Sequence, residues 1–228
     1  MKTLLKDNTS KRWYPTLVSE YIKQLKIESV WGDENGYRTK RNISYSLQYL
    51  QYIQKQLVDL NLSSVITTML FKTYIITGMG IVEALLVNLL KRNGMWKQSE
   101  WKSIGSLETN EKSLNEQKVK LKTEILEKCE YYDINMDLDS MIKRVEKKSL
   151  IEIDHDNFPV LKKLRQLRNR VHLQVGDNHL DHDYNAFNYN EKEDMRKILY
   201  ILLTNQEFCN CPENLSQYDF LRNNGMDE

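Results

Sequence analysis

The stretch VITTMLFKTYIITGMGIVEALLVNLL, which runs from Val65 to Leu90, decides the expected fold of this chain. Its apolar residues cover most sides of a helix, so it predicts a long helix buried in the core. A serine at 63 or 64 is expected to cap its start, and Asn93-Gly94 to end it. Gly78 and Gly80 lie inside this apolar run, so we expect close approach of a neighbouring helix there rather than a phosphate-binding loop.

The composition favours a helical, cytoplasmic protein. The 228 residues include only 8 Gly and 3 Pro, which argues against a turn-rich β-sandwich or barrel. The 33 basic and 32 acidic side chains nearly cancel, so nucleic-acid binding would need a local patch. Three cysteines form no disulfide framework, residues 1–13 hold no apolar signal segment, and Lys72 and Glu83 make the central stretch a poor membrane span.

Around the central helix the periodicity predicts an all-α fold. The other expected helices are residues 14–27, 43–60, 111–130, 136–148 and 157–174, and a last helix from Asn190, which Glu193 caps. Loops are expected at 31–40 and 175–189, and Trp96 and Trp101 are expected to anchor the unassigned stretch between 95 and 110 to the body. This pattern divides the chain into an N-terminal extension (1–40), a helical domain (41–210) with an insertion at about 95–150, and a polar, poorly ordered tail (211–228).

One segment, Leu164 to Leu173, carries residues suited to chemistry. At ~100° per residue, Val160, Leu164, Leu167 and Val171 form an apolar stripe. A second stripe runs beside it and consists of Arg165, Arg168, Asn169 and His172. An imidazole can move a proton to or from a ribose hydroxyl near neutral pH, and a guanidinium presents donors to a phosphate. The grouping suits phosphodiester cleavage in RNA without a metal ion or other cofactor.

These residues resemble the Arg-x(4–6)-His motif that HEPN-domain ribonucleases carry on a late helix. Arg165 to His172 fits as Arg-x6-His, and Arg168-Asn169 supplies the arginine followed by a polar residue. Arg168 to His172 is only Arg-x3-His, which leaves open which arginine is catalytic. The resemblance implies a HEPN-like helical bundle in which an acidic residue of the early core helix faces the motif, and Glu83 is the candidate.

The resemblance also implies a function. It predicts a metal-independent endoribonuclease, a hydrolase that uses 2′-hydroxyl attack, with RNA as substrate, a homodimer joined at the motif helices, and an antitoxin or other regulatory partner. Toxin–antitoxin or antiviral defence is the expected setting. The alternative is a non-catalytic helical module that binds a protein or RNA through the same polar stripe.

Two further groups have weaker claims to a function. His179, Asp181, His182 and Asp183 could suggest a metal site, but a polar loop lacks the fixed geometry that a metal requires, so no metal is expected. Tyr45, Tyr49 and Tyr52 could stack bases. Their near-helical spacing fits half-buried contacts on an amphipathic helix better.

Overall fold

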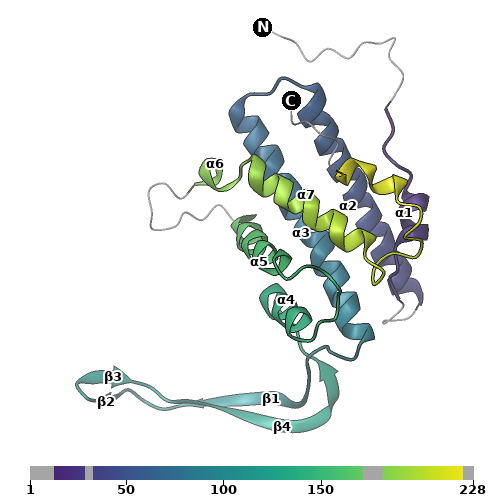
Figure 1. Cartoon of the computed structure of the whole chain (residues 1–228). Helices are drawn as coiled ribbons and strands as arrows, with labels where there is room; N and C mark the ends of the chain where they lie inside the picture. The colour runs from purple at the N-terminus through teal and green to yellow at the C-terminus, as the bar shows by residue number, and fades with distance from the viewer. Residues whose placement is uncertain (1–12, 29–32, 172–181, 223–228) are drawn as a thin grey trace.

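The protein is built around a long central helix. The computed structural model describes residues 13–28, 33–171 and 182–222. Helix α3 (Ser64–Arg92) contacts α2 (Asp33–Asp59), α7 (Tyr189–Thr204), α5 (Asn157–Arg168) and α4 (Leu138–Lys147), while the short α1 (Val18–Gln24) packs on α2 (Figure 1). A long β-hairpin projects from one end of this helical body.

Helix α3 has the position and the bounds that its sequence predicts. Thirteen of its residues are buried. Gly94 follows the end of the helix and has a φ of 64°, a left-handed conformation that often ends helices and that glycine adopts most easily. Ser63 lies at the N-cap position, although its side chain makes no capping hydrogen bond. By length and composition α3 could cross a membrane, but 61% of its apolar window is buried, as in the central helix of a globular bundle.

The second helix begins earlier than the sequence suggests. We predicted a loop at 31–40 from Gly32 and Gly36, but α2 is already helical from Asp33. A helical glycine costs only about 1 kcal/mol relative to alanine, which local contacts can offset. Here the Arg41 guanidinium lies over the rings of Tyr37 and Tyr45, at 5.9 and 5.5 Å from their centroids.

The prediction of an all-α fold is wrong, because the insertion is a β-hairpin. Strands β1 (Gln98–Glu108) and β4 (Lys122–Asp133) pair antiparallel, and β2 (Lys112–Leu114) pairs with β3 (Gln117–Val119) at the tip. The protein is therefore mixed α/β, mostly helical with this hairpin. Trp101, which we expected to anchor the segment to the body, lies on β1 and is 47% exposed.

The order of the residues explains why this segment forms a hairpin, although its composition favours a helix. From Val119 to Ile125, β-favouring or apolar side chains alternate with charged ones, which is the period of a strand and not of a helix. Leu114 pairs with Gln117, so the loop is the two residues Asn115 and Glu116, with φ of 50° and 63°. Two successive positive φ values define the tight turn whose twist suits a hairpin.

The C-terminal third contains further corrections. Helix α7 buries the core face that the sequence predicts. Its N-cap, however, is Asn188, whose side chain accepts a hydrogen bond from the Asn190 N–H at 2.9 Å. Glu193, the expected capping partner, instead binds Lys192 and Arg196, both at 2.7 Å. The expected core face consists of Met195, Ile198, Leu199, Leu202 and Leu203.

The polar tail is partly ordered against the N-terminal segment. The short helix η2 (Ser216–Leu221) buries Tyr218, whose ring lies 5.9 Å from that of Tyr21 in α1. An isolated β-bridge joins Leu25 to Cys209 close by. The first helix is accordingly shorter than the 14–27 predicted, because the chain after Gln24 is extended in order to make this bridge.

Candidate functional site

The segment with the motif forms the last turns of α5 and the start of the chain that follows. Helix α5 ends at Arg168, and residues Asn169–Val171 continue as the short 3-10 helix η1. Asn169 is the C-cap, and its backbone N–H donates to the carbonyl of Arg165. His172, the predicted proton-transfer residue, lies outside the described residues, as do His179 and Asp181.

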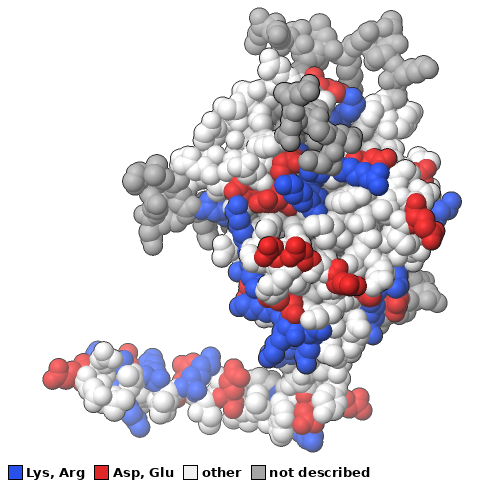
Figure 2. All heavy atoms as spheres, viewed as in Figure 1, with Lys and Arg blue, Asp and Glu red and all other residues white. Residues whose placement is uncertain are grey.

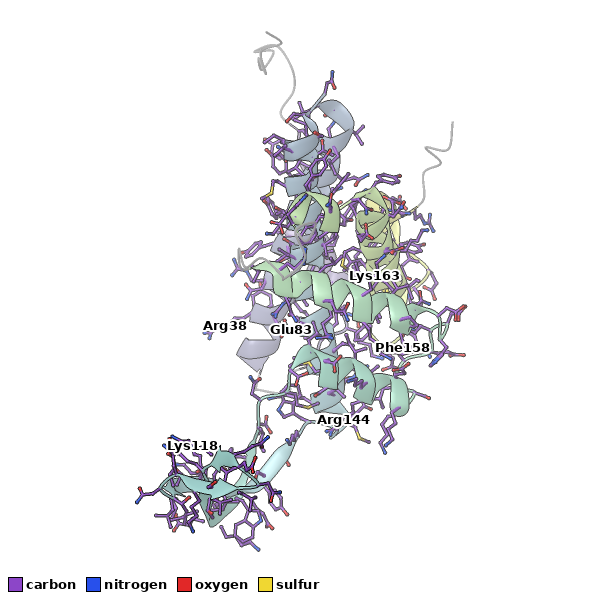
Figure 3. All side chains as sticks on the ribbon, turned by 90° about the vertical axis from the view of Figure 1, so that its left-hand side faces the viewer. Arg38, Glu83, Lys118, Arg144, Phe158 and Lys163 are labelled. Atoms are coloured by element: carbon purple, nitrogen blue, oxygen red, sulfur yellow. The ribbon has the colours of Figure 1, made fainter. Side chains whose placement is uncertain are left out.

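Arg168 is held at the edge of the core by the central helix. Its Nη2 atom donates to Oε2 of Glu83 at a distance of 2.8 Å, which joins the end of α5 to the middle of α3. Both side chains keep about a third of their surface exposed, so the pair lies at a rim and not in the interior. Figure 3 shows Glu83 near the end of α5 opposite Phe158. Arg168, predicted from the motif, and Glu83, predicted as the acidic residue that faces it, are therefore in direct contact.

Arg165 has a different acidic partner. Its Nε lies 3.2 Å from Oδ1 of Asp139, in the first turn of α4, and the atom is buried. The distance is that of an ion pair, but the angle does not make a hydrogen bond. Asp139 also binds Lys143, at 2.5 Å. The two arginines thus belong to one side of α5, yet Arg165 is directed to α4 and Arg168 to α3.

The apolar stripe beneath them differs in part from the one predicted. Leu164 is fully buried, but Val171 is 49% exposed. The helix changes to 3-10 geometry after Arg168, so the 100° progression on which the stripe was built stops one turn too early. The buried side of α5 is instead formed by Phe158, Leu161 and Leu164.

The lysines of α5 are also paired with carboxylates. Lys162 binds Glu146 at 2.6 Å, and Lys163 lies 3.0 Å from Glu191 of α7. The hydrogen bond to Glu191 raises the pKa of Lys163 above its ordinary value. This part of the surface therefore has charges of both signs, and Figure 2 shows the two signs mixed over the body in that view. Phosphate binding here would require a guanidinium that keeps free donors beside its carboxylate.

Sequence reasoning missed two ionic contacts near this region. Asp139 was predicted only as part of a helix, and its contact with Arg165 was not foreseen. Asp183, considered for a metal site, binds the buried Lys72 at 2.6 Å, and Lys72 also lies over the ring of Phe187. Within residues 13–28, 33–171 and 182–222, no three His, Cys, Asp or Glu side chains are grouped so as to hold a metal ion.

Comparisons of the chain with protein-family models, with curated proteins and with solved structures found no match.

Proposed function

We propose that this protein is a metal-independent endoribonuclease of the HEPN type. The observation that supports the proposal best is the Arg168–Glu83 contact, which holds a partly exposed guanidinium at the end of α5, four residues before His172. In the proposed reaction the ribose 2′-oxygen attacks the adjacent phosphorus and the 5′-oxygen leaves. The products are a 2′,3′-cyclic phosphate and a free 5′-hydroxyl, and His172 transfers protons between the two oxygens.

The arginines have unequal suitability for phosphate binding. A guanidinium carries five N–H donors, and the Glu83 contact uses an Nη2 donor of Arg168 and leaves others for a phosphate. Arg165 is less exposed than Arg168, and its Nε faces Asp139. We therefore assign the phosphate-binding role to Arg168 and a positioning role between α5 and α4 to Arg165. Glu83 would fix the plane of the Arg168 fork, as a preorganised donor set requires.

The alternative function is a non-catalytic module that binds a protein or RNA. A specific observation favours it: both arginines already have carboxylate partners, as structural ion pairs do. Under this alternative Arg168 and Glu83 simply hold α5 against α3, and the surface would recognise its partner without cleaving it. The ribonuclease proposal includes a homodimer joined at the motif helices and a regulatory partner such as an antitoxin. The alternative includes neither.

The decisive experiment compares purified wild type with His172→Ala and Arg168→Ala on cellular RNA. Fragments that end in a 2′,3′-cyclic phosphate are expected from the wild type. His172→Ala should cleave roughly 10²–10⁴-fold more slowly, the usual range for a positioned acid or base. Arg168→Ala, which removes a charge that stabilises the transition state, should cleave roughly 10²–10³-fold more slowly. Arg170→Ala, which changes a neighbouring charge off the stripe, is the matched control and should keep its activity.

Thermal melts decide whether the comparison is fair. All variants should unfold within a few degrees of the wild type, because none removes a residue of the buried side of α5. If His172→Ala cleaves RNA as fast as the wild type, the ribonuclease proposal fails. If the wild type binds RNA or a protein without cleavage, the interaction-module alternative replaces it.

A further inference from the structure

The β-hairpin, residues 98–133, is an arm with little support from the rest of the protein. It extends away from the helices in Figure 1, and Figure 3 shows Lys118 on the arm, away from α5. Contacts at its base include the ion pair between Lys91 of α3 and Asp133, at 2.5 Å, and the Ile134 N–H bond to the Lys97 carbonyl. A two-stranded hairpin alone is marginally stable in water, so the arm needs a partner that covers it.

The surface of the arm fits a protein partner better than a nucleic acid. Six lysines stand against eight carboxylates between 98 and 133, so the arm is slightly acidic, and Figure 2 shows both signs along it. Large apolar side chains project from it, and such exposure commonly marks an interface between proteins. The exposed apolar side chains of the arm are Trp101, Ile104, Leu107, Leu114, Leu121, Ile125, Leu126, Tyr131 and Tyr132.

Strand β4 has a regular open edge between Lys122 and Lys128. Among the described residues β4 pairs with β1 alone, so its other edge carries backbone groups free to extend the sheet. From Lys122 to Lys128 every residue of β4 has a β1 partner in unbroken succession, whereas β1 has an extra residue at Ile104 within this stretch. The irregular part of β4, residues 129–131, lies beyond Lys128. A bulge disrupts the ladder on the strand that contains it, so between Lys122 and Lys128 a second strand adds more readily to β4 than to β1.

We propose that β4 pairs antiparallel with β4 of a second copy of this chain, around a two-fold axis at Leu126. The two arms would then form one four-stranded sheet, with Leu126 of each copy facing the other. In such a pair, opposed residues lie on the same face, so the axis must pass through a residue and not between two. This inference is independent of the proposed ribonuclease function.

The charges of β4 select that axis. With Leu126 at the centre, Glu124 of each copy faces Lys128 of the other, within the regular part of β4. Lys128 also lies 3.3 Å from Glu100 of its own arm, so it would stand between two carboxylates. A shift of the centre by one residue to Ile125 brings Lys122 opposite Lys128. The opposite shift, to Glu127, brings the two Glu127 side chains together. Opposite charges directly across a strand pair stabilise it and like charges destabilise it, so the charges favour the Leu126 register over its two neighbours.

The test reverses and then exchanges these charges. Wild type should sediment as a dimer at micromolar concentration. Glu124→Lys alone, or Lys128→Glu alone, creates two like-charge pairs per dimer and should weaken dimerisation at least about tenfold. The double variant Glu124→Lys/Lys128→Glu restores both pairs across the dimer, although not the Lys128–Glu100 ion pair within each arm, and should dimerise clearly more tightly than either single variant. Lys118→Glu, which breaks the exposed Lys118–Glu111 ion pair at the tip of the same arm, is the control and should dimerise normally.

Cross-linking provides a second measurement. In a Cys129→Ser background, Leu126→Cys should form an intermolecular disulfide under mild oxidation, because opposed residues of an antiparallel pair lie ~4.5–5.5 Å apart at Cα. Leu114→Cys at the tip should not. A monomeric wild type, a dimer insensitive to either charge reversal, or a double variant as weak as the single ones would each overturn the proposal. A dimer joined only at the helices of the motif would be recognised because the charge reversals on β4 would not weaken it. RNA cleavage, measured separately, tests the other proposal.

Discussion

Helices α3 and α7 cross closely at Gly78, and this contact predicts opposite effects for two neighbouring substitutions. A Cβ atom added at Gly78 would lie 2.8 Å from Cγ and 2.9 Å from Sδ of Met195, and 3.2 Å from Cδ1 of Leu199. A Cβ added at Gly80, two residues later on the same helix, would meet nothing within 4 Å. The two glycines therefore differ in packing while sharing the same helical backbone.

The magnitudes follow from two competing effects. Replacing a helical glycine by alanine gains about 1 kcal/mol of helix propensity, so Gly80→Ala should raise the free energy of unfolding by about that amount. Gly78→Ala gains the same propensity but overpacks the crossing, at a cost of roughly 1–3 kcal/mol. Its net effect is a loss of up to about 2 kcal/mol. At 2–4 °C per kcal/mol, roughly the scale for a chain of this size, the two melting temperatures should differ by several degrees.

Urea unfolding followed by circular dichroism at 222 nm measures the difference, and a double-mutant cycle identifies its cause. In a Met195→Ala background the two shortest contacts are absent and only the 3.2 Å contact with Leu199 remains, so Gly78→Ala should become stabilising by up to about 1 kcal/mol. Equal stabilisation by Gly78→Ala and Gly80→Ala in the wild-type background would refute the close approach of the two helices. So would a Gly78→Ala effect that Met195→Ala leaves unchanged.

Three other predictions concern a buried ion pair, a helix cap and the metal independence of the proposed reaction. Asp183→Ala should lower the free energy of unfolding by about 3 kcal/mol, because it leaves the buried Lys72 charge unpaired. Lys72→Met keeps the packing on Phe187 and should lower it clearly less. Equal losses for the two variants would contradict this expectation. Asp137 caps α4 by accepting from the Ser140 N–H at 2.8 Å, which holds its pKa below the usual 3.8. Its stabilising effect is present above pH 3.8 and is lost as the pH falls through the lowered pKa, so the melting temperatures of wild type and Asp137→Ala should converge there and differ at pH 7. EDTA should leave RNA cleavage unchanged, and a loss that a divalent ion restores would contradict the metal-independent mechanism.

Much of the helical body could be predicted from the sequence, because its signals are local. The apolar run of α3 and the core positions of α7 repeat with the helical period, and Asn93-Gly94 ends α3 where a positive φ is needed. For the candidate site, the sequence placed both arginines on one side of a helix and proposed Glu83 as an acidic neighbour. The contact of Arg168 with Glu83 agrees with that geometry, while the roles of these residues remain a proposal.

Other features depended on contacts between distant parts of the chain. The segment 111–130 contains many residues that favour a helix, but it has no helical apolar stripe, and pairing with the strand at 98–108 decided its conformation. Gly78 and Gly80 look equivalent in the sequence, yet only Gly78 lies against α7. Arg165 and Arg168 belong to the same stripe, and only the positions of α4 and α3 assign them to Asp139 and Glu83. Local periodicity determines which side of an element is buried, whereas the partner of a charged side chain depends on which other element the fold brings beside it.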